Sequence, residues 1–184
     1  AMLVNSPGGS PVQSHLIFQR IRALAAETKK KVYVFTEDVA ASGGYFLAVA
    51  GDEIYADPAS VVGSIGVISA SFGFEKAIKK LGVERRVHTA GSHKMSLDPF
   101  RREKPDDVRR LKAIQQDIHQ LFIGLVKKSR GRKLKGPEKT LFSGEFWGGG
   151  KAVQYGLADR LGEIKSVLYE RYGKKVETPL IAPP

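Results

Sequence analysis

Residues 31–50, KVYVFTEDVAASGGYFLAVA, contain the pattern that decides the fold. The segment 31–36 is rich in β-branched and aromatic residues, which is typical of a buried strand. A loop is expected over 37–41, and the small and apolar residues of 43–50 predict a helix that begins directly after Ser42. A strand, a short loop and a helix in this order form the repeating unit of α/β proteins with a parallel sheet.

The same alternation continues along the chain. Helices are expected at 11–26, 74–81, 105–128, 151–155 and 163–172. Strands are expected at 1–4, 31–36, 52–56, within 61–70 and at 83–88. We therefore predict an α/β fold with a mostly parallel sheet. Because 1–4 has the composition of a buried strand, which needs a partner on each side, we also expect N-terminal strands of this sheet to be missing from the chain.

Two helix ends are marked by local signals. Ser10 is a good N-cap, and Pro11 suits the first helical position because proline has no N–H to leave unpaired there. Gly82 is placed to end the helix at 74–81 in the left-handed conformation. In the first helix, apolar residues recur at helical spacing at Val12, Leu16, Ile17, Ile21 and Leu24.

Composition sets broad limits. With 184 residues, 42% of them hydrophobic, the chain can bury one core, and we predict a single domain over 1–184. The absence of cysteine excludes disulfides and thiolate metal sites. No apolar run in the sequence reaches the 18 or so residues that a transmembrane helix needs.

The formal charge is +11, and most of it lies in a basic helix and loop at 101–135, which contains 12 basic and 4 acidic residues. This segment has a single aromatic residue, Phe122, whereas nucleic-acid-binding surfaces usually carry aromatic side chains for stacking. We expect no nucleic-acid partner. A membrane-facing or partner-facing helix fits the pattern, and an ordinary solvated helix face fits it equally well.

Ser42 is a candidate nucleophile because two glycines follow it, and glycine lets a substrate approach the backbone closely. Judged alone, a serine at the start of a helix is more often an N-cap. The Gly8–Gly9 turn and Gly43 could supply backbone amides to an oxyanion hole. Judged alone, a glycine turn at this position is more often only the turn that leads into a helix, with glycines chosen for its geometry.

Two kinds of base could activate Ser42. Of the four histidines, at 15, 88, 93 and 119, only His93 is expected in a glycine-containing loop, where it could pair with Asp98. The neighbouring Lys94 is the other candidate. A lysine that acts as a base needs its pKa lowered from about 10.4 towards 7, which requires burial. Ser64, in a tight turn between glycines, could orient such an amine. Spacing and composition do not choose between the two bases.

Several motifs together resemble the signal peptide peptidase A and SohB family of serine peptidases. They are Asn5-Ser-Pro-Gly-Gly-Ser10, Ala40-Ala-Ser-Gly-Gly-Tyr45, Val62-Gly-Ser-Ile-Gly-Val67 and Gly91-Ser-His-Lys-Met95. Two later motifs, Phe142-Ser-Gly-Glu145 and Ala152-Val-Gln-Tyr-Gly-Leu-Ala-Asp159, match the family's helical C-terminal part, here 142–172.

This resemblance implies a ClpP/crotonase-like fold and a Ser/Lys dyad, with Ser42 as nucleophile and Lys94 as general base. Ser64 resembles the hydroxyl that orients the lysine. Gly43 and the Gly8–Gly9 turn match the oxyanion hole, with Gly9 the less certain donor. The related ClpP peptidases have a histidine where this chain has Val67, which favours the lysine.

The resemblance also implies partners and a location. Peptides are the expected substrates, among them remnant signal peptides and other hydrophobic segments, and no cofactor or metal is expected. A homo-oligomeric ring and attachment to the bacterial inner membrane are further expectations. Two alternatives remain open: a crotonase-type acyl-CoA enzyme, and a non-catalytic membrane-associated scaffold of the same fold.

Overall fold

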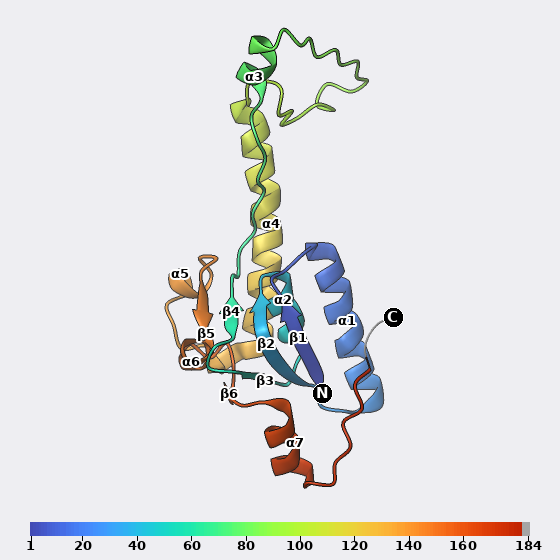
Figure 1. Ribbon diagram of the computed structural model, residues 1–184, viewed down its shortest axis with the longest axis vertical. Coiled ribbons are helices and arrows are strands. Elements are labelled where there is room, and N and C mark those ends of the chain that lie inside the picture. The colour runs from blue at the N-terminus through green and yellow to red at the C-terminus, as the bar shows by residue number, and fades with distance from the viewer. Residues whose placement is uncertain (182–184) are drawn as a thin grey trace. The chain divides into compact units, whose positions relative to one another are not determined.

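The computed structural model describes residues 1–181, which fall into two compact units (Figure 1). The first unit consists of residues 1–66 together with the chain from residue 121 onwards. The second unit consists of residues 67–120. Helix α4, Pro105–Arg130, begins in the second unit and ends in the first.

A six-stranded sheet organises the first unit. Five of its strands follow the order β5-β4-β2-β3-β6, and the sixth, β1, also pairs with β2. Its strands are β1 Met2–Ser6, β2 Tyr33–Ala41, β3 Glu53–Ala56, β4 Val61–Gly63, β5 Phe146–Gly148 and β6 Arg160–Leu161. Only the β4–β5 pair is antiparallel. The predicted α/β fold with a mostly parallel sheet is confirmed.

Strand β2 is the centre of this sheet, and it is longer than predicted because the expected loop at 37–41 continues the strand. Its first half pairs with β1 and β3, so that Val34 lies beside both Met2 and Ile54. Its last residues pair with β4, where Ala41 lies beside Gly63. The ends of β2 and β4 therefore meet at one place.

The helices of the first unit are α1 Pro11–Thr28, α2 Gly43–Ala48, α5 Glu138–Leu141, α6 Gly149–Gln154 and α7 Ile164–Tyr172, with a 3₁₀ turn at Gly131–Lys133. The start of α1 is as predicted: the Ser10 side chain accepts a hydrogen bond from the Gln13 amide, and Pro11 is the first helical residue. The short elements α5, β5 and β6 were not predicted, because segments of two to four residues show no periodicity.

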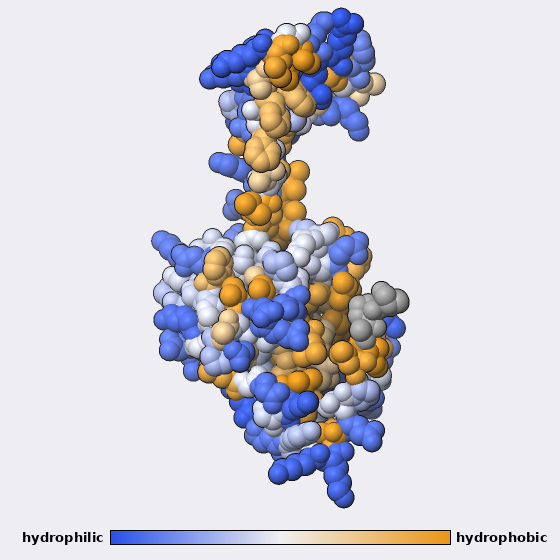
Figure 2. Space-filling view, in the orientation of Figure 1, coloured by the Kyte–Doolittle hydropathy of each residue, from blue (hydrophilic) through white to orange (hydrophobic). Residues whose placement is uncertain are grey.

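The apolar stripe of α1 identified the helix but not its buried face. Val12, Leu16 and Ile17 are exposed, and the residues of α1 that are buried are Ser14 and Ala25. Figure 2 shows apolar side chains at the surface over α1. Strand β1 is likewise less buried than expected, since only Val4 is inside the core. Among residues 1–181, no helix combines the length and apolar content needed to cross a bilayer.

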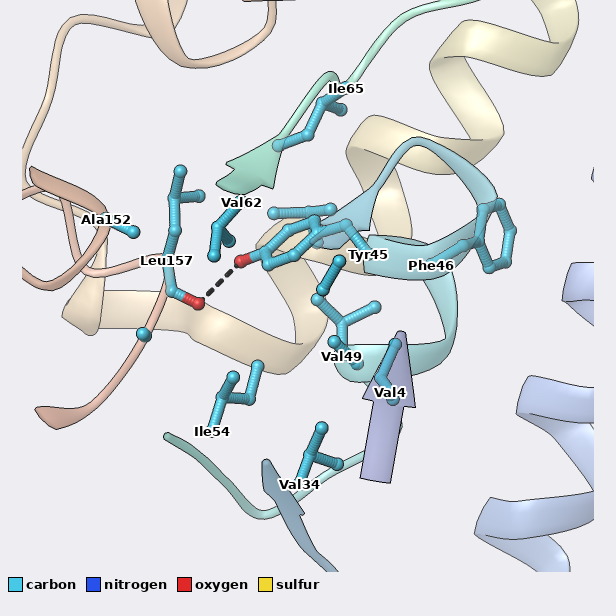
Figure 3. Close-up of a cluster of buried hydrophobic side chains, with 14 of the residues drawn as sticks. Val4, Val34, Tyr45, Phe46, Val49, Ile54, Val62, Ile65, Ala152 and Leu157 are labelled. Carbon is cyan, nitrogen blue, oxygen red and sulfur yellow. Dashed lines mark hydrogen bonds between the residues drawn. The ribbon is translucent and has the colours of Figure 1, made fainter. Parts of the chain in front are cut away.

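The core lies on both faces of the sheet, because successive residues of β2 point to opposite sides. Val34 belongs to the larger cluster, which α2, α6 and the end of α4 cover (Figure 3). Tyr33 and Phe35 belong to a smaller cluster with residues of α7. Within the larger cluster, the fully buried Tyr45 donates a hydrogen bond from its hydroxyl to the Leu157 carbonyl at 2.8 Å (Figure 3).

Tyr45→Phe is expected to lower the free energy of unfolding by about 1–3 kcal/mol, because the Leu157 carbonyl would lose its partner in a dry environment. Burial raises the pKa of Tyr45, so the hydroxyl stays protonated and keeps donating at alkaline pH. Urea denaturation of the two proteins measures the difference. An unchanged midpoint would show that water replaces the lost bond.

The second unit contains α3, Glu75–Lys80, the first part of α4, and long loops. Gly82 ends α3 with a φ of +66°, as predicted. The strand predicted at 83–88 is wrong: these residues form no strand. Their side chains are mostly exposed, and Arg85 instead forms an ion pair with Asp98. A strand needs a hydrogen-bonding neighbour, and the local sequence of a segment does not show whether one is present.

Candidate active site

Ser42 lies at the turn between β2 and α2, with φ 50° and ψ −121°. This backbone conformation is costly for a residue other than glycine, and such strain is concentrated at functional sites. Ser42 occupies the N-cap position, but its side chain makes no capping hydrogen bond. Its amide donates to the Gly63 carbonyl at 2.9 Å, which fixes the turn to the end of β4. The hydroxyl is therefore held at a strained turn without a capping role.

The Gly8–Gly9 turn packs directly against Ser42. A Cβ placed on Gly8 would lie 3.1 Å from Ser42 Oγ and 3.2 Å from the Gly43 nitrogen. A Cβ placed on Gly43 would lie 3.0 Å from the Gly9 nitrogen. The structure thus brings the three predicted oxyanion-hole glycines together at Ser42, and these approaches leave no room for a larger residue at Gly8 or Gly43.

The amides of these glycines are not equivalent. The Gly8 N–H donates to Ser6 Oγ at 3.2 Å. Gly43 is the first residue of α2, and the first amides of a helix have no acceptor within the helix. Of the three predicted donors, Gly8 is thus the one whose amide is already bonded, and Gly43 and Gly9 stay the predicted pair. Sequence reasoning missed Ser6, although its position two residues before a glycine turn is a recognisable signal.

Ser64 follows the end of β4, next to Ser42, because Ala41 and Gly63 are paired neighbours in the sheet. Its φ is 53°, and its amide donates to the Glu145 carbonyl at 2.7 Å. Strand β5 packs against this turn through Trp147: a Cβ placed on Gly63 would lie 2.9 Å from the Trp147 ring. Ser42 and Ser64 are thus both held in strained conformations at adjacent strand ends.

Lys94 and His93 lie in a loop of the second unit, and both side chains are exposed. The Lys94 amide donates to the Gly91 carbonyl, which makes a local turn. The dyad with Ser42 stays a prediction. In the alternative, His93 would pair with Asp98, but Asp98 already accepts hydrogen bonds from the Phe100 amide and from Arg85. Burial raises the pKa of the Asp98 carboxyl, but these hydrogen bonds outweigh burial and hold that pKa below its usual value.

Gly44→Ala is expected to lower the free energy of unfolding by about 3 kcal/mol, since overpacking against fixed backbone is costly. A Cβ on Gly44 would lie 2.2 Å from the Ser6 carbonyl oxygen. Gly150→Ala is the matched control, because Gly150 is also the second residue of a six-residue helix but has open space around it. In this control the free energy of unfolding should rise by about 0.5–1 kcal/mol, because alanine is a better helix former than glycine. Equal midpoints in chemical denaturation would contradict the close packing of α2 on β1.

Comparison with known proteins shows which family the chain resembles. Residues 25–176 match the model of Peptidase family S49, a range that includes Ser42, Ser64 and Lys94 but begins after Gly8 and Gly9. The chain is 33% identical to a chloroplastic serine protease SPPA of Arabidopsis thaliana, with 90% of this chain and 24% of that protein aligned. It is 29% identical to a putative signal peptide peptidase SppA of Enterococcus faecium, with 90% and 47% aligned.

A relative from Brucella abortus is 61% identical over 183 residues and carries the name Na(+)/H(+) antiporter NhaA. The aligned stretch is only 25% of that protein, so its name describes a much longer chain. In all, this chain spans between about a quarter and a half of the length of these curated relatives. The peptidase model matches residues 25–176, more than half of this chain, and the chain belongs to Peptidase family S49.

Proposed function

We propose that this domain is a serine endopeptidase in which Ser42 attacks the scissile carbonyl of a peptide. One observation carries the proposal: the Ser42 hydroxyl, free of a capping role, stands at a strained strand-to-helix turn against the Gly8–Gly9 turn and the start of α2. Membership of Peptidase family S49 supports the same chemistry and favours it over the acyl-CoA alternative.

In the proposed mechanism, neutral Lys94 takes the proton of Ser42 as the bond to the substrate forms. The amides of Gly43 and Gly9 hold the oxyanion, and a single such donor is typically worth about 3 kcal/mol of barrier lowering. The Ser64 hydroxyl orients the amine. Lys94 then gives its proton to the leaving amine and activates the water that releases the acyl-enzyme.

The proposed substrates are membrane-derived peptides, such as remnant signal peptides, cleaved at the bacterial inner membrane by a homo-oligomeric ring. The name of the Enterococcus relative supports this substrate class. The basic segment 101–135 is a proposed docking face for the membrane. Arg130 is not part of this docking face, because its side chain is buried and pairs with Asp159.

Covalent labelling tests the nucleophile directly. The whole chain is treated with a fluorophosphonate probe, and the modified residue is identified by peptide mapping. We expect an adduct on Ser42 and none in Ser42→Ala, with equal melting temperatures for the two untreated proteins. A folded wild-type protein that takes no label, or is labelled elsewhere, would count against the peptidase. A shift in melting temperature with acyl-CoA would instead favour the crotonase-type alternative.

A further inference from the structure

Ser14, in the first turns of α1, is a buried polar residue that the proposed mechanism does not use. It is 7% exposed, and its hydroxyl donates to the Ser10 carbonyl at 3.0 Å. The Ser14 amide already donates to the same carbonyl, also at 3.0 Å. The helix therefore does not need this hydroxyl, and serine is a neutral or unfavourable choice in a helix interior.

The Ser14 hydroxyl lies directly against the start of α2. A Cβ placed on Gly43 would be 2.7 Å from Ser14 Oγ, and on the same side it would be 3.0 Å from the Gly9 nitrogen. One oxygen atom thus stands between the helix that follows the Gly8–Gly9 turn and the first residue of α2. The turn that leads into α1 and the first residue of α2 carry the two proposed oxyanion donors, Gly9 and Gly43.

We propose that Ser14 is a positioning residue that sets the separation of the Gly9 and Gly43 amides. Oxyanion donors are effective only when both lie at about 2.7–3.1 Å from the same oxygen position. A smaller side chain at position 14 would let α1 and α2 move together, and a larger one would push them apart. This inference rests on the proposed function, because it concerns the same transition state.

Ser14→Ala in the whole chain is the first test, with Ser14→Val as a second, larger variant. We expect kcat for an apolar fluorogenic peptide to fall about tenfold in Ser14→Ala and about a hundredfold in Ser14→Val, with KM nearly unchanged. The binding constant of a peptide aldehyde, whose adduct with Ser42 places an oxyanion in the hole, should weaken by the same factors. The corresponding peptide alcohol, which forms no adduct, should bind as before.

Ser129→Ala is the matched control. Its hydroxyl also donates to a backbone carbonyl, that of Val49, but at the opposite end of α2. This variant should keep kcat and the aldehyde affinity within about twofold of wild type, since the amide separation is untouched.

The outcomes separate the two proposals. Wild-type kcat and aldehyde affinity in Ser14→Ala would overturn the role of Ser14 and leave the peptidase intact. Equal weakening of aldehyde and alcohol binding, or an equal loss in Ser129→Ala, would also overturn it, because the effect would then be structural. A wild-type protein that neither cleaves peptides nor labels at Ser42 would remove the proposed function, and the assignment of Ser14 with it.

Discussion

Ser42→Ala is expected to lower kcat for apolar peptides by at least about 10⁴-fold, the loss typical of removing the nucleophile of a serine peptidase. The geometry gives the reason: Ser42 Oγ would lie 3.1 Å from a Cβ placed on Gly8, whereas Ser64 follows the end of the neighbouring strand, β4. Steady-state hydrolysis of a fluorogenic peptide measures the change. Activity of Ser42→Ala at the wild-type rate would exclude Ser42 as the nucleophile.

Lys94→Ala is expected to be as inactive as Ser42→Ala, because a serine hydroxyl is a poor nucleophile without its base. His93→Ala is the matched control, since His93 precedes Lys94 in the same exposed loop. It should keep activity within a few-fold of wild type. The reverse result, an inactive His93→Ala and an active Lys94→Ala, would assign the base to the histidine.

Mixing the two inactive variants tests whether one active site takes its serine and its lysine from different chains. If the serine of one protomer works with the lysine of another, a mixed Ser42→Ala and Lys94→Ala assembly restores about a quarter of the sites by random association. If both residues act within one chain, no activity returns. The exposure of Lys94 in this chain makes the experiment informative, because a lysine base needs to be buried to lose its proton.

The part of the site near Ser42 was predictable because it depends on local signals. Ser10 and Pro11 mark the start of α1, and the glycines at 8, 9 and 43 mark turns with close backbone approach. The parallel sheet then brings the ends of β2 and β4 together, which places Ser64 beside Ser42. Alternating strands and helices are enough to predict such a sheet.

Other features depend on neighbours that no local pattern reveals. Residues 83–88 were predicted as a strand, but within the described residues they pair with no other strand and remain irregular. The contact between Ser14 and Gly43 joins residues from two helices, and a lone serine in α1 gives no sign of it. The basic residues of 101–135 looked uniform in sequence, although Arg130 proves to be buried and the others do not share its environment.

Arg130 is the last residue of α4 and is 2% exposed. Its Nε donates to the Gly156 carbonyl, and one of its terminal nitrogens pairs with Asp159 at 2.8 Å. Within the described residues, the other terminal nitrogen has no hydrogen-bond partner. Asp159 also accepts from the Ile54 amide and forms a second ion pair with Lys133 at 2.6 Å, so this carboxylate ties the end of α4 to the start of β3.

Arg130→Met is therefore expected to lower the free energy of unfolding by about 3 kcal/mol, because it leaves a partly buried carboxylate with only the more exposed Lys133 as counter-charge. Arg160→Met is the matched control: its ion pair with Glu170 is exposed and should be worth less than about 1 kcal/mol. Urea denaturation at neutral pH measures both. Equal losses would contradict the special role of Arg130.

The pH dependence of the same difference identifies Asp159 as the partner. Burial raises the pKa of Asp159, but hydrogen bonds from Arg130, Lys133 and the Ile54 amide outweigh it and hold that pKa below its usual value. A carboxyl whose pKa is lower in the folded than in the unfolded protein stabilises the fold above its unfolded pKa of about 3.9, and loses this effect as the pH falls through the folded value. The difference in the free energy of unfolding between wild type and Arg130→Met should thus be largest near neutral pH and shrink in acid.

Asp159→Asn is the control, because its side chain cannot ionise. In this background, Arg130→Met should lower the free energy of unfolding by less, and the loss should not vary across this acid range. A cost that stays constant with pH in the wild-type background would show that the Gly156 carbonyl, and not Asp159, is what Arg130 mainly stabilises.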